Sequence, residues 1–499
     1  MGRKAPLAVT HSTSNQTPST KELDEGEEML HEACRTFLER AKLRRQREMA
    51  RLNQQMQLFD SGLEQLQPVQ AAESIISTST PTIDTSSSDS QRAVFDFEHA
   101  SESRDQLPHL MVGANHQRRL QARLYKHFDD LQEAYLEHHA VADDKREAFR
   151  RFADDVRNMD QFARLESVCR LRYGDLYNNN SIVSSIELDP EENRFATAGV
   201  SKQIRVYDYN TVLSRGRQGA EIHLPILTMD CPSKISCLAW NPVQGHQLAS
   251  SDNHGSVRVW DVNAGTPITV FQEHERRVWS VDVNRQNPVL LASGSDDRQV
   301  KIWSTRIPQH SVYTMTGPAN VCCVRFNESD GNYVAFGSAD HHIHYYDLRK
   351  PNKEVWTFRG HEKAVSYVQF LSGHELLSAS TDGTLRVWRV DQQNAHRAFA
   401  GHCNERNFVG LARRDANFFV TGSEDNAVYV YYKGLTAPLL RGACDTEAAV
   451  PQPVVAAGQA GAEPASRGFV SAVSWRRTDD ALLVANSEGT LLVYQLHHE

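Results

Sequence analysis

One short pattern recurs through the C-terminal part of the chain and restricts the fold more than any other feature. It is a run of alternating aliphatic residues that ends in an aromatic residue, as in VRVWD, VKIWS and LRVWR. The aromatic residues are Tyr207, Trp260, Trp303, Tyr346, Trp388, Tyr431 and Tyr494. They follow one another at spacings of 53, 43, 43, 42, 43 and 63 residues. Short strands that repeat every 40–45 residues or so are typical of β-propeller blades. We therefore predict an all-β, seven-bladed propeller of the WD-repeat type over residues 177–499.

An acidic residue stands six positions before the aromatic residue in five blades. These residues are Asp297, Asp340, Asp382, Asp425 and Glu488. This position falls in the tight turn between two strands, where a carboxylate can bond a buried histidine of the same blade. His274, His361 and His402 begin blades 3, 5 and 6, and we expect them to be these partners. The widest spacing between blades contains an Ala/Gly/Pro-rich stretch, 434–467, which we interpret as a loop insertion.

The chain before the propeller divides into four segments. Residues 1–21 are polar and are predicted to be disordered, and residues 68–112 form a linker rich in Ser and Thr. Residues 22–67 carry apolar residues at steps of three and four, which predicts a coiled coil. The alternative for this helix is an amphipathic helix that docks on its own chain. Residues 113–176 are predicted to be a second helical region.

Composition excludes several classes of function. The net charge of −9 and the pI of about 6.2 lack the excess of basic residues that direct nucleic-acid binding needs. No apolar run reaches the length of a membrane span. The eight cysteines include no CxxC pair, so we predict no metal site and a reducing compartment. No phosphate loop, nucleophile elbow or HExxH motif occurs, so we predict no cofactor and no catalytic residues.

One histidine cluster is the strongest candidate for a metal site within the propeller. It is the sequence Asp340-His341-His342-Ile343-His344. In a strand, His342 and His344 share one face while His341 points to the other, so three ligands do not converge. Local polar bonding within blade 4 is the better interpretation.

Six residues near the starts of the innermost strands predict a binding surface at the mouth of the channel. Counting back 23 to 26 positions from the aromatic residue of each blade reaches Lys234, Arg277, Trp279, Lys363, Glu405 and Phe408. Equivalent positions in successive blades face the same rim. Cations beside large aromatic residues suit an extended peptide with acidic flanks and an apolar anchor. The alternative is that Trp279 and Phe408 are ordinary packing residues between blades.

Several longer strings resemble those of the constitutive photomorphogenic E3 ubiquitin ligases. They include HERRVWSVDV, GSADHHIHYYDLRK, GHEKAVSYVQF and NERNFVGL, and the resemblance extends over residues 115–499. Related suppressor-of-phytochrome-A proteins share the coiled coil and the propeller. The resemblance implies a propeller mouth that binds Val-Pro peptides of transcription factors and photoreceptors. The positions matching this peptide site are the six rim residues named above.

The resemblance also implies two departures and a second site. The family has a tyrosine where this chain has Asn253. No cysteine-rich RING finger precedes the coiled coil, so we expect either a gene model that lost its start or a RING-less partner protein. Tyr346-Asp347-Leu348-Arg349 fits the aromatic-Asp-x-Arg motif of cullin substrate receptors, although this motif is common in propellers.

These observations lead to three hypotheses for the function. The first is a substrate-recognition and scaffold subunit of a photomorphogenic-type ubiquitin ligase. Its coiled coil would either form a dimer or pair with a RING-bearing ligase or a suppressor-type partner, and the protein would bind a cullin adaptor. The second is a suppressor-type regulator without ligase function, and the third is a general propeller scaffold unrelated to ubiquitin. The resemblance implies a location in the nucleus and cytoplasm and a role in light signalling.

Overall fold

Seven antiparallel sheets of four strands each make up most of the described chain. The structure, a computed structural model, describes residues 43, 45–47, 49–61, 63, 118–142, 144–172, 182–219, 223–392, 395–444 and 468–498. The predicted disordered tail and the linker lie outside these residues. The seven sheets confirm the predicted seven-bladed propeller. None of the described helices is both long and apolar enough to cross a membrane.

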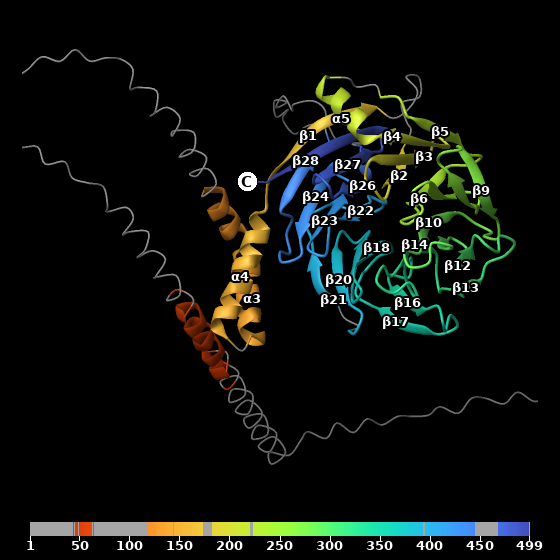
Figure 1. Cartoon of the computed structure of the whole chain (residues 1–499). Coiled ribbons are helices and arrows are strands. Elements are labelled where there is room, and N and C mark those ends of the chain that lie inside the picture. The colour runs from red at the N-terminus through yellow and green to blue at the C-terminus, as the bar shows by residue number, and fades with distance from the viewer. Residues whose placement is uncertain are drawn as a thin grey trace, which may run out of the picture. The chain divides into compact units, whose positions relative to one another are not determined.

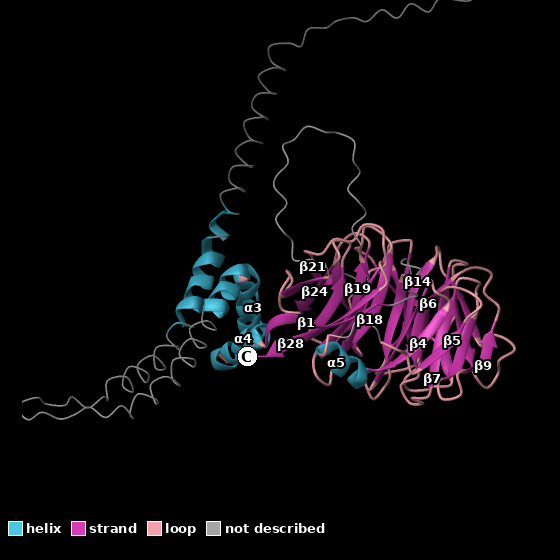
Figure 2. Cartoon of the chain, turned by 90° about the horizontal axis from the view of Figure 1, so that it is seen from above, coloured by secondary structure: helices cyan, strands magenta, loops and turns pink. Residues whose placement is uncertain are grey.

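The blades follow one another around an axis in the order of the sequence. The innermost strands β2, β6, β10, β14, β18, β22 and β26 surround this axis in Figure 1. Figure 2 shows the connecting loops along the two faces of this disc. The turns that precede the innermost strands lie on one face, which we call the upper face. It also carries the turns between the second and third strands of each blade, because neighbouring strands are antiparallel.

The strands of each blade run outward from the axis. Blades 1 to 4 consist of β2 (Val183–Leu188), β3 (Arg194–Gly199), β4 (Gln203–Asp208) and β5 (Leu227–Asp230); β6 (Ile235–Trp240), β7 (Gln247–Asp252), β8 (Val257–Asp261) and β9 (Thr266–Phe271); β10 (Val278–Val283), β11 (Leu290–Ser295), β12 (Gln299–Ser304) and β13 (Tyr313–Thr316); and β14 (Val321–Phe326), β15 (Tyr333–Ser338), β16 (Ile343–Asp347) and β17 (Glu354–Phe358). Blades 5 to 7 consist of β18 (Val365–Ser372), β19 (Glu375–Ser380), β20 (Leu385–Arg389) and β21 (Ala395–Phe399); β22 (Leu411–Arg413), β23 (Phe418–Gly422), β24 (Ala427–Tyr432) and β25 (Leu440–Ala443); and β26 (Val470–Arg476), β27 (Ala481–Asn486), β28 (Thr490–His498) and β1 (Phe162–Arg172).

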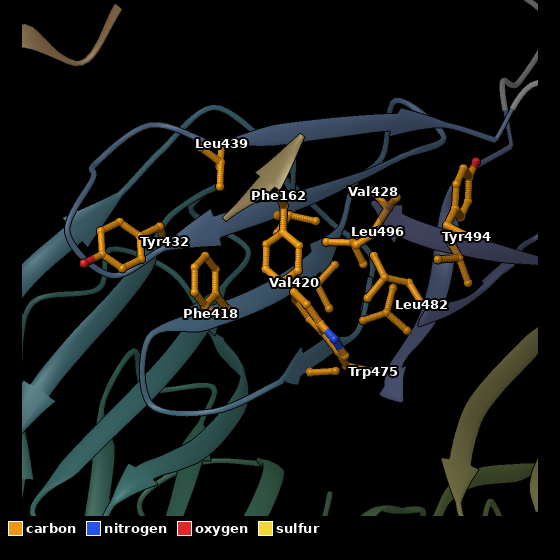
Figure 3. Close-up of a cluster of buried hydrophobic side chains, with 14 of the residues drawn as sticks. Phe162, Phe418, Val420, Val428, Tyr432, Leu439, Trp475, Leu482, Tyr494 and Leu496 are labelled. Carbon is orange, nitrogen blue, oxygen red and sulfur yellow. The ribbon is translucent and has the colours of Figure 1, made fainter. Parts of the chain in front are cut away.

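Blade 7 closes the ring with a strand from the other end of the domain. Strand β1 pairs antiparallel with β28 as the outermost strand, and the two lie side by side in Figure 1. The prediction of a helical region as far as residue 176 is wrong for residues 162–172, which form this strand. Phe162 is fully buried at its start, among Phe418, Val420 and Trp475 (Figure 3). Strand β1 thus covers the edge of β28 and becomes the outer edge of blade 7, as the fourth strand does in each of the other blades.

Helical residues before β1 pack against blades 6 and 7. They are residues 118–134, which include the start of α3 (Phe128–Val141), and residues 150–160 of α4 (Lys145–Asp160). The buried guanidinium of Arg123 donates to the carbonyl oxygens of Phe162 (2.6 Å) and Ala163 (3.2 Å). Tyr432 of β24 donates its hydroxyl to Asp155 of α4 at 2.7 Å. This part of the helical region is therefore attached to the propeller by buried polar contacts.

The described part of the predicted coiled coil is helical over residues 49–61. Three apolar residues of its predicted seam, Met49, Leu52 and Met56, are between 55% and 64% exposed. On the same helix, the ring of Phe59 stacks on Tyr135 with centroids 5.4 Å apart. The Tyr135 hydroxyl donates to the Leu58 carbonyl at 2.9 Å. Phe59, another residue of the predicted seam, thus docks on its own chain while Met49, Leu52 and Met56 stay exposed, and the coiled coil stays a prediction.

The predicted histidine–carboxylate pairs are confirmed in blades 3 and 5. In blade 3, Nδ1 of His274 lies 2.6 Å from Asp297, and Nε2 lies 2.7 Å from the Ser293 hydroxyl. The same hydroxyl accepts a hydrogen bond from the Trp303 indole at 2.8 Å. The corresponding contacts in blade 5 join Asp382, His361, Ser378 and Trp388. Each set links the turn to the aromatic residue of the repeat, which explains their shared spacing.

The prediction is wrong for blade 6. Nδ1 of His402 lies 3.0 Å from the hydroxyl of Tyr431, the aromatic residue of this blade. Asp425 instead accepts hydrogen bonds from the Tyr429 hydroxyl (2.7 Å) and from Arg441 (3.0 Å). Burial lowers the pKa of His402 to about 4, so its ring is neutral near pH 7 and can accept from the tyrosine hydroxyl.

Two further elements differ from expectation. The predicted loop 434–467 contains β25, the outermost strand of blade 6, and residues 445–467 lie outside the described residues. A helix between β4 and β5, α5 (Tyr209–Arg217), was not predicted. The side chain of Asp208 caps it by accepting from the Thr211 amide at 2.7 Å.

Candidate peptide-recognition site

A cavity of about 420 Å³ lies at the upper end of the channel, where the innermost strands begin. Four of the six predicted rim residues line it: Lys234, Arg277, Trp279 and Phe408. They come from blades 2, 3 and 6, so the fold brings together residues that are far apart in the sequence. Their place in this cavity agrees with the rim positions found by counting, and their role in binding stays a prediction.

The two aromatic side chains meet in this cavity. The rings of Trp279 and Phe408 have centroids 4.8 Å apart and planes tilted by 55°. Both side chains are half-buried rather than enclosed between sheets. Tyr367 of β18 extends the group, since its ring lies 5.9 Å from that of Phe408. The cavity therefore has an aromatic wall drawn from blades 3, 5 and 6.

Two cations lie beside this wall. The guanidinium of Arg277 lies over the Trp279 ring, 4.6 Å from its centroid. Within the described part of the chain, the buried Nε of Arg277 has no hydrogen-bond partner. Lys234 is exposed and holds the neighbouring turn by accepting from the Asn253 amide at 3.0 Å with its carbonyl. Their charged groups can thus receive an acidic group of a ligand bound against the aromatic wall.

The other two predicted rim residues are not brought into the cavity. Lys363 and Glu405 are exposed on the turns before β18 and β22, and neither lines it. They lie on the upper face outside the aromatic wall. A ligand would have to extend beyond the cavity to contact them.

Sequence reasoning missed Tyr367 and Asp296. Tyr367 follows Lys363 and Val365 at steps of two, so strand alternation could have placed it on the channel side. Asp296 accepts a hydrogen bond from the Trp279 indole at 2.7 Å and another from Asn320 at 3.1 Å. The spacing of these residues carries no signal for this contact. Asn253, where the resemblance implies a tyrosine, lines the same cavity.

A second cavity of about 350 Å³ occupies the lower end of the channel. Glu187 and Arg325 line both cavities, so they mark the middle of the channel. Burial raises the pKa of Glu187 to about 7, and it raises that of Asp282 to about 6. Arg325 lies 3.6 Å from Asp282 and opposes both shifts. Cationic and acidic side chains in the lower cavity pair with one another, so this cavity favours no single class of ligand.

The candidate cullin-adaptor motif lies on the face opposite the aromatic wall. Tyr346 and Asp347 end β16, and Arg349 is in the following turn. Arg349 donates to Asp347 at 2.7 Å and to the Tyr333 hydroxyl at 3.0 Å. The hydrogen bond from Arg349 lowers the pKa of Asp347. The motif thus forms a local ion pair, and its binding to an adaptor stays a prediction.

The histidine cluster of blade 4 forms a local polar group. Nε2 of His344 lies 3.0 Å from Asp340, and Nδ1 lies 2.6 Å from Glu354. Burial alone would lower the pKa of His344, but the two carboxylates outweigh it and raise the pKa to about 9. Among the residues described, no group of three or more His, Cys, Asp or Glu side chains is arranged to hold a metal ion.

Known proteins resemble this chain over a large share of its length. The WD domain, G-beta repeat, matches residues 224–261, 265–304, 309–347 and 352–389. The E3 ubiquitin-protein ligase COP1 of Arabidopsis thaliana is 42% identical over 394 residues, which cover 75% of this chain and 56% of that protein. Protein SPA1-RELATED 4 of the same plant is 40% identical over 67% of this chain and 41% of its own length.

A shorter relative matches over most of its length. The WD repeat-containing protein RUP2 of Arabidopsis thaliana is 37% identical, over 63% of this chain and 88% of its own length. The chain spans less than two thirds of the length of its COP1 relatives. The seven sheets, the repeat matches and these identities agree with one another. The chain belongs to the family of WD-repeat proteins that includes the COP1 and SPA proteins.

Proposed function

We propose that this protein is a substrate-recognition and scaffold subunit of a COP1/SPA-type ubiquitin ligase. Its propeller binds Val-Pro peptide motifs of target proteins in the upper cavity. The observation that carries the proposal is the contact between Trp279 and Phe408 beside Arg277 and Lys234. An aromatic wall next to two cations suits an apolar dipeptide with acidic neighbours.

The aromatic wall supports the apolar part of this recognition. Valine and proline side chains present compact apolar surfaces without hydrogen-bond donors. Proline also limits the conformational entropy that an extended peptide loses on binding. The three rings of Trp279, Phe408 and Tyr367 offer such a peptide a continuous apolar surface.

The cations support the acidic part. The buried Nε of Arg277 lacks a partner among the described residues, and an unsatisfied buried donor is costly. A carboxylate of the ligand would satisfy it. Lys234 stands at the exposed edge of the same cavity and would attract the same acidic flank.

The helix at residues 49–61 supports a scaffold role. Its exposed Met49, Leu52 and Met56 suit pairing with the coiled coil of a RING-bearing partner. Such pairing would hold a bound target close to the conjugating enzyme that carries the activated ubiquitin. In this proposal the protein acts in light signalling, in the nucleus and the cytoplasm. The Tyr346-Asp347-Leu348-Arg349 motif is its contact to a cullin adaptor.

Calorimetric titration of the full chain with a Val-Pro peptide carrying acidic flanks tests the proposal. Binding should fall at least tenfold when both anchor residues of the peptide become alanine. It should fall similarly in Lys234→Glu. Lys353→Glu is the matched control, because it makes the same charge change at an exposed position on the opposite face. Equal affinity for the Val-Pro peptide and its double-alanine form would refute Val-Pro recognition. Equal losses of affinity in Lys234→Glu and Lys353→Glu would show that the effect at Lys234 comes from the net charge of the protein.

A further inference from the structure

Seven equivalent turn residues encircle the upper end of the channel. In each blade a residue of the turn after the second strand donates its backbone amide to a carbonyl in the segment that leads into the innermost strand. The donors are Val200, Asn253, Asp296, Ala339, Thr381, Glu424 and Ser487, and the acceptors are Ile182, Lys234, Arg277, Asn320, Ala364, Cys403 and Phe469. We call these seven donors the turn ring.

Only two members of the turn ring carry a carboxylate. They are Asp296 in blade 3 and Glu424 in blade 6. These are the two blades that supply Trp279 and Phe408, the rings in contact in the upper cavity. In the other five blades this position carries Val, Asn, Ala, Thr or Ser.

In blade 3 the carboxylate fixes the aromatic side chain directly. Asp296 accepts from the indole N–H of Trp279 at 2.7 Å, while Asn320 of the next blade donates to the same oxygen at 3.1 Å. A hydrogen bond at the indole nitrogen selects one orientation of a ring that is otherwise half-exposed. Arg277 covers the ring at 4.6 Å.

In blade 6 the carboxylate fixes the backbone that carries the aromatic residue. One oxygen of Glu424 accepts from the amides of Arg406 (2.8 Å) and Asn407 (2.7 Å) and from the Asn407 side chain (3.1 Å). Burial alone would raise the pKa of Glu424, but these hydrogen bonds outweigh it and lower the pKa. Phe408 follows directly, so the orientation of its Cα–Cβ bond depends on this bonded turn.

We propose that Asp296 and Glu424 are positioning residues that hold Trp279 and Phe408 in the geometry a peptide ligand needs. Each acts through an aromatic residue of the cavity and does not itself belong to the apolar wall. The inference rests on the proposed function for its ligand, while the positioning of the two rings is a property of the free protein. Holding the rings before binding limits the entropy lost on association.

The test for blade 3 separates the hydrogen bond from the charge. Asp296→Asn keeps an oxygen that accepts from the indole, whereas Asp296→Ala removes it. We expect Asp296→Ala to weaken binding of the Val-Pro peptide about tenfold, with Asp296→Asn within about twofold of the wild type. An Asp296→Ala variant that binds as the wild type does would overturn the proposal.

A second readout does not depend on the peptide. Nuclear magnetic resonance of the full chain labelled with ¹⁵N-tryptophan shows the indole N–H groups, and the signal absent in Trp279→Phe is that of Trp279. This signal should shift upfield in Asp296→Ala and stay near its wild-type position in Asp296→Asn. An unchanged signal in Asp296→Ala overturns the positioning role. If the wild type binds no Val-Pro peptide but the signal shifts as expected, the positioning stands and the proposed ligand fails.

The same logic applies to blade 6. Glu424→Gln keeps an oxygen for the amides of Arg406 and Asn407, so it should retain peptide affinity, whereas Glu424→Ala should lose about tenfold. Thr381→Ala is the matched control, since Thr381 holds the same ring position in blade 5, where neither Trp279 nor Phe408 lies. A loss in Thr381→Ala equal to that in Glu424→Ala, or no rescue by glutamine, would contradict the proposal.

Discussion

The ring of Trp279 in blade 3 lies 4.8 Å from the ring of Phe408 in blade 6, although these blades are not neighbours in the propeller. Most ring contacts among the described propeller residues join residues of one blade or of adjacent blades, as Phe271 and Trp303 or Tyr345 and Phe370 do. This one closes over the upper end of the channel, where the innermost strands begin. The two side chains are therefore best understood as one surface, which a ligand meets as a unit.

The shared surface predicts that substitutions of the two rings are not additive. Trp279→Ala and Phe408→Ala should each weaken binding of the Val-Pro peptide about tenfold, roughly 1.4 kcal/mol. The double variant should lose only about twentyfold to thirtyfold, because each single change already leaves the other ring without its packing partner. Titration calorimetry of the four proteins gives the coupling free energy. Tyr313→Ala, at an exposed aromatic residue of β13, is the control.

A hundredfold loss in the double variant would show that the rings bind independently. Loss of affinity in Tyr313→Ala comparable with either single change would show that the assay reports general destabilisation. Each result contradicts the model of one aromatic surface.

The blades could be predicted from the sequence because each contains the same local signals. The alternation of aliphatic residues sets the strands, and the aromatic residue with its upstream carboxylate sets the register between blades. Counting from Trp303 or Tyr431 therefore reached Trp279 and Phe408 without knowledge of the fold. The cavity they line follows from the geometry that all blades share.

The contacts that the sequence did not reveal depend on partners far along the chain. Strand β1 pairs with β28, more than 300 residues away, and it lies before the first of the seven aromatic residues from which the blades were counted. The role of Asp296 depends on the direction in which the Trp279 indole points, which no spacing encodes. Asp425 could equally well have bonded His402, and only the geometry of the blade shows that it bonds Tyr429 instead.

The closure of blade 7 predicts a strong effect at Phe162. This side chain is fully buried, and it packs edge-on against Phe418 with centroids 5.1 Å apart (Figure 3). Phe162→Ala should lower the free energy of unfolding by about 3–5 kcal/mol, because it leaves a cavity where β1 begins. Urea denaturation followed by circular dichroism measures the change. Arg164→Ala, on an exposed side chain two residues along the strand, should change stability by less than about 0.5 kcal/mol.

A chain that begins at residue 181 should lose more stability than Phe162→Ala does. It lacks β1 and leaves the edge of β28 unpaired, so we expect a lower unfolding midpoint and aggregation. A truncated protein as stable as the full chain would show that β1 does not close the ring.

The buried charge of His344 predicts a stability that declines at alkaline pH. Its pKa is about 9 in the folded protein and near 6.5 in an unfolded chain, because Asp340 and Glu354 favour the charged ring. The resulting stabilisation is complete below pH 6.5 or so and is lost as the pH rises through about 9. The difference in unfolding free energy between the wild type and His344→Asn should thus shrink by roughly 2 kcal/mol or more over this range.

Urea denaturation at several values between pH 6 and pH 9.5 measures this difference. Groups common to both proteins, such as Glu187, cancel from it. His374→Asn makes the same change at an exposed histidine and should show a small difference without this trend. A difference for His344→Asn that grows towards pH 9 would mean that the buried ring is neutral.

The position of Asn253 predicts a gain of affinity. Its half-buried side chain lines the upper cavity, and its backbone amide is held by the Lys234 carbonyl at 3.0 Å, so a larger side chain leaves the turn itself intact. Asn253→Tyr should strengthen binding of the Val-Pro peptide up to about tenfold. The tyrosine ring would add a contact to the aromatic wall that contributes about 1 kcal/mol or more to the binding free energy. Asn253→Ser is the control, since it removes the amide without adding a ring and should change affinity less than about twofold. Weaker binding by Asn253→Tyr would show that the cavity cannot hold this ring and the peptide together, and that the asparagine favours a bulkier ligand.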